Sequence, residues 1–219
     1  MENKKFEQNI NPHDYVGTSR FKKFLHFIKI PLISICCLGV ITGIVYPIVV
    51  TGVGQAVFNY EANGSLIKIK LKDGTVVTYG SKLIGQDFYT NNNGQYMFGR
   101  LDFGQEGKPQ TDAEKAKKHF DDLLTKYNLK PTTPIPQELL TNSGSGVDPN
   151  ISIEAAKWQA DLIVAARTEL KKTNPDTIVP TKEEIYSYIN KYSDKQFVGI
   201  FGNNVTNVLL VNLAIDKKI

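Results

Sequence analysis

The stretch Ile30-Pro-Leu-Ile-Ser-Ile-Cys-Cys-Leu-Gly-Val-Ile-Thr-Gly-Ile-Val-Tyr-Pro-Ile-Val-Val50 decides how this chain is organised. Its 21 residues include no Asp, Glu, Lys or Arg. As an α-helix it would extend about 32 Å, which matches a bilayer hydrocarbon core of about 30 Å. The sequence therefore predicts one membrane-spanning helix, which we place within residues 30–57.

Two other kinds of segment can be this apolar. A cleaved signal peptide has an apolar run of about 7–15 residues that ends at a small-x-small site. The run here is longer, and its one candidate site, Gly54-Gln55-Ala56, follows a segment that contains Gly and Thr. A soluble core helix without a polar face would need protein on every side, which the rest of the chain is too short to supply.

The charges beside the run predict its orientation. Arg20, Lys22, Lys23 and Lys29 lie within ten residues of it on one side, and the other side has no Lys or Arg before Lys68. By the positive-inside rule, residues 1–29 form a short basic cytoplasmic tail at the cell membrane and residues 58–219 lie outside. The tail has six Lys or Arg against three Asp or Glu, and so holds most of the net charge of +4. This excess favours contact with anionic membrane lipid and gives no reason to expect a nucleic-acid partner.

A pattern inside the run favours contact with another helix. Gly39 and Gly43 form a GxxxG pattern, which allows a neighbouring helix to approach closely. Pro47, one turn further on, would bend or loosen the helix. Chance is the alternative explanation, because glycine is common in apolar segments.

Residues 58–219 are predicted to form one α+β domain without disulfides, since both cysteines, Cys36 and Cys37, lie in the apolar run. Two alternating segments on either side of Asp73-Gly74 predict a β-hairpin. The capping pattern Thr111-Asp-Ala-Glu114 predicts a helix as far as Tyr127. We expect two further helices, one over 152–172 with Ser152 as its N-cap and one that begins at Thr181-Lys-Glu-Glu184, and then a strand over 207–215.

Residues that could form a catalytic or metal site are scarce. The only histidine beyond the apolar run is His119, which is expected on a solvated helix face beside two lysines. Ser143-Gly-Ser-Gly146 lacks the spacing of a nucleophile elbow, and no P-loop or Rossmann fingerprint is present. The sequence therefore predicts no catalytic residues, no metal site and no cofactor of the chain's own.

Three polar features of the domain have both a functional and a structural interpretation. The Gly-Ser turn at 143–146 could cradle an anion at a helix N-terminus, or could be a tight turn in which Asp148 and Ser152 satisfy helix amides. Gln159 and Arg167 are polar residues on or beside the inner face of the 152–172 helix, where such groups mostly bond within the fold or at an interface.

Several blocks of the sequence resemble, in the same order, the C subunit of Kdp potassium-transporting ATPases, the KdpC family. They are Thr42–Gly52 with Gln55, Ala62–Ile67, Gly80–Gln86, Asn142–Ser152 with Glu154–Ala156, Gln159 and Ala165–Arg167, and finally Phe201-Gly202 with Asn207–Ala214. The chain departs from the family's Gly-Arg-Pro-Ser segment, because Leu101-Asp102 follows Gly99-Arg100.

The resemblance implies a non-catalytic, single-pass subunit of an ATP-driven potassium pump. Its partners would be a channel-like potassium-binding subunit, a P-type ATPase subunit and a small single-helix subunit. The GxxxG pattern and the first block together make Gly39, Gly43, Tyr46, Pro47 and Gly52 the expected partner-binding residues.

The family is further described as raising the affinity of the ATPase subunit for ATP, and its suggested nucleotide contact corresponds to Gln159. ATP itself would be bound mainly by the partner ATPase subunit. If residues 58–219 lie outside the cell, Gln159 cannot touch cytoplasmic ATP, and any effect must travel through the membrane subunits.

Two other functions remain open at this point. The first is a membrane-tethered extracytoplasmic sensor or ligand-binding domain. The second is a membrane-anchored hydrolase that would use Ser145, which the absence of a plausible base disfavours.

Overall fold

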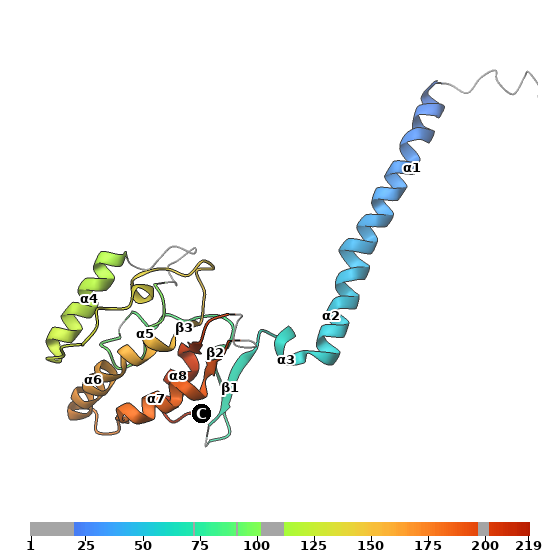
Figure 1. Ribbon diagram of the computed structural model, residues 1–219. Coiled ribbons are helices and arrows are strands. Elements are labelled where there is room, and N and C mark those ends of the chain that lie inside the picture. Colours follow the sequence, from blue (N-terminus) through green and yellow to red (C-terminus); the bar gives the residue numbers. More distant parts are fainter. Residues whose placement is uncertain (1–19, 72, 91, 102–111, 197–201) are drawn as a thin grey trace, which may run out of the picture. The chain divides into compact units, whose positions relative to one another are not determined.

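The computed structural model describes residues 20–71, 73–90, 92–101, 112–196 and 202–219 (Figure 1). The chain divides into two compact units, Met1–Ala62 and Asn63–Ile219. The first contains one long apolar helix and the second is a mixed domain of helices and short strands. The expected order of an apolar helix followed by an α+β domain is therefore confirmed.

The described part of the first unit is helical apart from Phe58. Helix α1 (Arg20–Val40) continues through a π-helical turn, η2 (Ile41–Val45), into α2 (Tyr46–Val57), and the short helix α3 (Asn59–Ala62) follows. The continuous segment Phe27–Val57, 31 residues long, is long and apolar enough to cross a membrane, and none of its hydrophobic window is buried by the rest of the chain.

A β-hairpin opens the second unit, as the sequence predicts. Strands β1 (Leu66–Lys70) and β2 (Val76–Ser81) pair antiparallel, with Lys70 opposite Val76 and Leu66 opposite Ser81. Gly74 takes the positive φ of +87° that its turn requires. At the other end Gly80 has φ +143°, and a Cβ there would lie 1.8 Å from Nε2 of Gln86, so only glycine fits.

Helices form most of the regular structure of the domain beyond the hairpin (Figure 1). They are α4 (Ala113–Lys126), the 3₁₀ turn η4 (Gln137–Leu140), α5 (Ile153–Trp158), α6 (Ala160–Thr173), α7 (Lys182–Lys191) and α8 (Val208–Ile215). Strand β5 (Val205–Asn207) lies between β3 (Asn150–Ser152) and β4 (Ser193–Asp194) in a small antiparallel sheet.

The helix starts were predicted with mixed success. The capping box of α7 is present, with the Thr181 hydroxyl accepting from the Glu184 amide. For α4 the predicted cap was wrong by one residue. Asp112 is the N-cap and its carboxylate accepts from the Lys115 amide, whereas Thr111 lies outside the described residues.

The helix expected over 152–172 is interrupted. Ser152 is its N-cap as predicted and accepts from the Ala155 amide. The chain then forms α5 and α6 with Gln159 at the junction. There the backbone N–H of Gln159 donates to the carbonyl of Ala156, three residues back. This 3₁₀-type bond tightens the helix at that point.

The strand predicted over 207–215 was wrong, because only Val205–Asn207 is extended and Val208–Ile215 is helix α8. The side chain of Asn207 accepts from the Leu210 amide and so starts the helix. Seven of its eight residues are buried. A fully buried apolar run has no polar face, and so its sequence carries no period that would distinguish helix from strand.

One hydrophobic core joins these helices. Its buried members come from the described helices of the domain, from strand β3 and from the loop before α4; they include Met97, Phe98, Phe120, Leu139, Ile151, Ala155, Ile163, Ile185, Ile189, Val211 and Ile215.

Candidate functional site

The apolar helix presents an uncovered face of small residues. Gly39 lies in α1, Gly43 in the π turn and Pro47 at the start of α2. A Cβ placed on Gly39, Gly43 or Gly52 would meet no described atom within 4 Å. Tyr46 is 63% exposed. All five predicted partner-binding residues are therefore accessible on the described chain.

The π turn affects which of these residues share a line along the helix. In an α-helix, a step of four residues rotates by slightly more than one full turn, because one turn has 3.6 residues. In the wider π-helical turn, the same step rotates by slightly less than one full turn. The two deviations offset each other, and so Gly39, Gly43 and Pro47 stay close to one line. By helical spacing Tyr46 and Gly52 point to other sides.

Pro47 explains why the helix widens at this point. Its ring would collide with the carbonyl four residues back, and it has no N–H to donate. The Tyr46 amide bonds to the Ile41 carbonyl, five residues back, which is the π pattern. The predicted loosening of the helix at Pro47 is thus present as a π turn rather than as a break.

Gln159, the residue for which the resemblance implies a nucleotide contact, is fully buried. Its Oε1 accepts from the Phe98 amide at 2.8 Å, and its Nε2 donates to the Phe98 carbonyl at 3.2 Å and to the Ala155 carbonyl at 3.2 Å. In this conformation the amide bonds only to backbone, and no atom of Gln159 reaches the surface. The nucleotide contact itself stays a prediction.

The buried side-chain amide of Asn212 bonds in the same way to the backbone of Met97, the residue before Phe98. Asn212 on α8 accepts from the Met97 amide at 2.8 Å and donates to the Met97 carbonyl at 3.0 Å. The backbone N–H and carbonyl of both Met97 and Phe98 are thus hydrogen-bonded to side-chain amides. Asn212 was not predicted from the sequence, although a single Asn inside an apolar run was the available signal.

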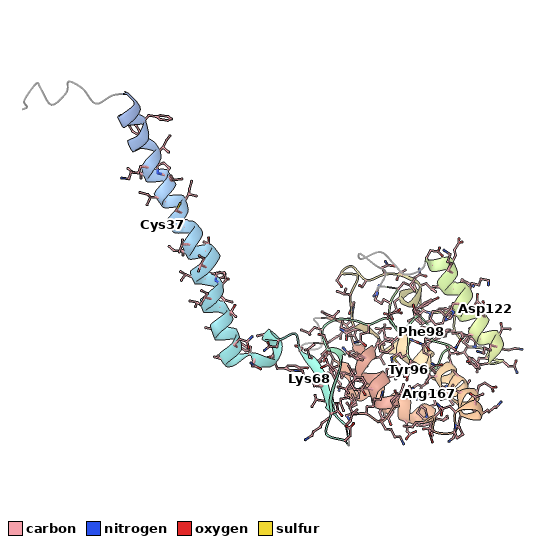
Figure 2. The ribbon with its side chains drawn as sticks, turned by 180° about the vertical axis from the view of Figure 1, so that it is seen from behind. Cys37, Lys68, Tyr96, Phe98, Asp122 and Arg167 are labelled. Carbon is pink, nitrogen blue, oxygen red and sulfur yellow. The ribbon has the colours of Figure 1, made fainter. Side chains whose placement is uncertain are left out.

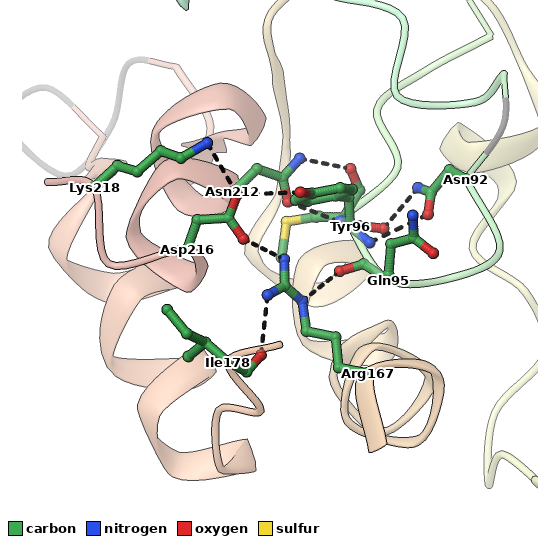
Figure 3. Close-up of polar contacts among 9 residues, drawn as sticks. Asn92, Gln95, Tyr96, Arg167, Ile178, Asn212, Asp216 and Lys218 are labelled. Atoms are coloured by element: carbon green, nitrogen blue, oxygen red, sulfur yellow. Dashed lines mark hydrogen bonds and ion pairs between the residues drawn. The ribbon is translucent and has the colours of Figure 1, made fainter. Parts of the chain in front are cut away.

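Arg167 lies at the centre of a polar network (Figure 3). Its guanidinium is paired with the Asp216 carboxylate at 2.7 Å, and it also donates to the carbonyls of Gln95 at 2.7 Å and Ile178 at 3.0 Å. The Tyr96 ring stacks against it, 4.9 Å from the guanidinium carbon. As expected for a polar group on an inner helix face, Arg167 bonds within the fold.

The rest of this network connects the C-terminal segment to the loop before α4. The Tyr96 hydroxyl donates to Asp216 at 3.1 Å, and Lys218 is 3.3 Å from the same carboxylate. Burial, and then the charge of Asp216, raises the pKa of Tyr96, so its hydroxyl stays a donor. Sequence reasoning did not find Asp216 or Tyr96, because their contacts join positions far apart in the chain.

His119 does not lie on a solvated face as predicted. Its ring is half-buried, 4.8 Å from the Tyr89 ring and 5.7 Å from Phe98. Its Nε2 and the Tyr89 hydroxyl are buried without a hydrogen-bond partner in the described structure. Burial lowers the pKa of His119, with a bond to the backbone of Asn92 opposing, and raises the pKa of Tyr89 to about 12. Both groups are held neutral at pH 7.

The Gly-Ser turn matches the tight-turn interpretation. The Gly146 amide bonds back to the Ser143 carbonyl, and Asp148 accepts from the Asn150 amide. The Ser152 side chain accepts from the Ala155 N–H, which belongs to helix α5. Asp148 accepts from the Asn150 N–H, which precedes the helix.

A hollow of about 700 Å³ lies between the proline-rich segment 131–137 and helices α5 to α7. The Trp158 indole donates to the Thr133 carbonyl at its edge. Of the charged groups in its wall, Lys182 is paired with Asp161 at 2.7 Å and Lys157 lies over the Tyr186 ring. No group of three or more His, Cys, Asp or Glu that could hold a metal occurs in the described residues.

Comparison with known proteins identifies the family. The family model described as KdpC, the c chain of K⁺-transporting ATPase, matches residues 28–217. The chain belongs to the KdpC family. The match begins inside α1 and ends after α8, so it includes both the apolar helix and the domain.

Individual KdpC proteins are similar over most of their length. The potassium-transporting ATPase KdpC subunit of Clostridium perfringens is 34% identical over 212 residues, which are 88% of this chain and 98% of that protein. Those of Bacillus mycoides and Paraburkholderia phytofirmans are 37% and 36% identical and cover 81% and 85% of this chain, and 89% and 95% of their own. Membership in KdpC makes this chain a non-catalytic C subunit of the Kdp ATPase.

Proposed function

We propose that this chain assembles and stabilises the potassium pump by binding its membrane subunits through the face Gly39–Gly43–Pro47 of the apolar helix. The observation that carries the proposal is this uncovered line of small residues, in a segment that the KdpC model matches. Small residues let helix backbones approach closely in a bilayer, where packing replaces the hydrophobic effect as the driving force.

The proposed partners are the channel-like potassium-binding subunit, the P-type ATPase subunit and the small single-helix subunit. The apolar helix would pack against the first two within the membrane. The domain would lie outside the cell, because the lysines and arginines that flank the helix precede it.

This orientation limits how the chain could raise the ATP affinity of the ATPase subunit. An extracytoplasmic Gln159 is separated from cytoplasmic ATP by the bilayer, and its amide is bonded to Phe98 and Ala155. We therefore propose that any effect on nucleotide passes through the membrane subunits, and that Gln159 contributes by holding the domain in shape.

Co-purification from native membranes tests the assembly role. Replacing both Gly39 and Gly43 with leucine should reduce recovery of the channel-like and ATPase subunits with the tagged chain in mild detergent. The matched control replaces Val40 and Ile44 with phenylalanine, which adds comparable bulk on the adjacent line of the helix. Equal recovery with both double variants would assign the GxxxG pattern to chance, and a clean monomer from the unaltered chain would refute the assembly role itself.

An ATPase assay of the pump with and without this chain addresses the nucleotide effect separately. The expected result is a higher KM for ATP when the chain is absent. An unchanged KM would leave assembly as the chain's contribution.

A further inference from the structure

The turn after strand β2 presents apolar side chains to the surroundings. Leu83 is 59% exposed and Ile84 is 53% exposed. Val147, 43% exposed, lies next to them, because the Gly85 amide donates to the Val147 carbonyl at 2.9 Å. We call Lys82, Leu83, Ile84 and Val147 the apolar turn. A group of adjacent exposed apolar side chains is a candidate for an interaction surface.

The backbone of the apolar turn is held in place by its neighbours. The Lys82 amide donates to the Ser65 carbonyl at 3.0 Å, and the Lys82 carbonyl accepts from the Asn207 side chain at 2.9 Å. The Leu83 amide donates to the Ser81 hydroxyl at 3.0 Å. These main-chain groups need no water, so moving the turn into an apolar environment leaves none of them unsatisfied.

Chain length keeps the apolar turn near the membrane. The turn is bonded to Ser65, and only residues 58–64 separate Ser65 from Val57, the last residue of the apolar helix. Four of these residues form helix α3 and rise about 1.5 Å each, while the others extend at most about 3.6 Å each. By chain length alone, Ser65, to which the turn is bonded, therefore lies within about 20 Å of Val57.

The charges beside the apolar turn favour lipid. Lys82 is exposed next to Leu83. Lys68 and Lys70 are exposed further along the hairpin, on strand β1, opposite Thr78 and Val76. Among the described residues none of these three lysines forms an ion pair. Lysines next to exposed aliphatic side chains are typical of segments that lie in the headgroup region of anionic membranes.

We propose that the apolar turn rests in the headgroup region of the bilayer that holds the apolar helix. Leu83, Ile84 and Val147 contact the upper acyl chains, and Lys82 binds anionic phospholipid headgroups. This second attachment would restrict the tilt of the domain over the membrane. It depends on the apolar helix spanning a bilayer and does not depend on which pump subunits bind that helix.

Tryptophan fluorescence of the full chain in vesicles tests this contact. The vesicles contain phosphatidylcholine and phosphatidylglycerol in equal parts, with acyl chains brominated near the headgroup as quencher. Leu83→Trp should emit at shorter wavelength and lose intensity to the brominated lipid, after subtraction of the native Trp158 signal. Asp122→Trp on α4, which lies far from the hairpin in both views, is the matched exposed control and should not be quenched (Figures 1 and 2).

Charge dependence separates headgroup binding from simple apolar contact. Lys82→Glu in the Leu83→Trp chain, or vesicles of phosphatidylcholine alone, should reduce the quenching. Ile84→Trp repeats the measurement at a second exposed position, in case Leu83→Trp fails to fold. Quenching no greater than that of Asp122→Trp would overturn the proposal. So would an emission shift that occurs only when the other pump subunits are present, because that result would assign the surface to a protein partner.

Discussion

The side-chain amide of Gln159 is hydrogen-bonded to both backbone polar groups of Phe98, accepting from its N–H at 2.8 Å and donating to its carbonyl at 3.2 Å. Gln159 stands at the junction of α5 and α6, and Phe98 is fully buried in the core. Asn212 is bonded in the same way to the N–H and carbonyl of Met97, so two side-chain amides satisfy the backbone of this segment. The helices and the loop before α4 are therefore joined at one buried point.

Gln159→Leu should lower the free energy of unfolding of the domain by about 2–4 kcal/mol, because the N–H and carbonyl of Phe98 would lose their partners while buried. Urea unfolding of the full chain in detergent, followed by circular dichroism, measures this. Gln196→Leu, at an exposed position, is the control and should change stability little.

A different substitution at the same position distinguishes a structural from a nucleotide-binding role for Gln159. If the residue contacts ATP, Gln159→Glu should alter the KM for ATP of the assembled pump while assembly is unchanged. If it holds the domain in shape, the KM should change only to the extent that assembly is lost.

Removing one partner of the Arg167–Asp216 pair should destabilise the domain strongly. Arg167→Met leaves the Asp216 carboxylate, which is 18% exposed, without its guanidinium, and frees the carbonyls of Gln95 and Ile178. Breaking a buried pair typically costs about 3–5 kcal/mol, and we expect the lower end here because Lys218 remains beside Asp216. The measurement is again the urea midpoint in detergent.

The solvent-exposed pair Lys118–Asp122 on α4 provides the control for that experiment. Its charged atoms are 3.4 Å apart and its side chains are 79% and 67% exposed. Surface pairs of this kind contribute less than about 1 kcal/mol. Lys118→Met should therefore shift the midpoint far less than Arg167→Met, and equal shifts would contradict the role given to the Arg167 network.

His119 should make the stability of the domain depend on pH. Burial lowers the pKa of His119 in the folded chain, so the unfolded chain binds more protons below the ordinary histidine pKa of about 6.5. The free energy of unfolding should then decrease as pH falls from about 6.5 through the lowered folded pKa. The charge of Asp122 opposes this shift without reversing it.

His119→Phe keeps a ring against Tyr89 and removes the titrating group. The difference in urea midpoint between the variant and the unaltered chain should change across this pH range and stay constant above it. A constant difference throughout would mean that His119 is as readily protonated in the folded domain as in the unfolded chain.

The sequence predicted those elements whose signals are local. The apolar helix, the hairpin around Asp73-Gly74 and the capping box at Thr181 each depend on residues a few positions apart. The strand predicted over 207–215 failed because burial on all sides removes periodicity, so the local pattern of Val208–Ile215 fits a helix and a strand equally well. The capping side chain of Asn207 was the one local signal for a helix.

The polar contacts of the domain were less predictable than its elements. Arg167 and Gln159 were recognised as inward-facing polar residues, but their partners Asp216 and Phe98 are 49 and 61 positions away. His119 was assigned to solvent because its neighbours in sequence are lysines, whereas its neighbours in space, Tyr89 and Phe98, come from a separate loop. Contacts of this range follow from the packing of the core and leave no pattern in a single sequence.

The predicted orientation can be tested by cysteine labelling. In a chain with Cys36 and Cys37 replaced by alanine, a single cysteine at exposed Lys130 should react with a membrane-impermeant maleimide in intact cells. The tail should react only after the membrane is opened, which a cysteine at Ser19 reports. The physical reason is the lysine and arginine excess before the apolar helix, which retains that end in the cytoplasm. Labelling of Ser19→Cys alone in intact cells would reverse the orientation, and would place Gln159 on the same side of the membrane as ATP.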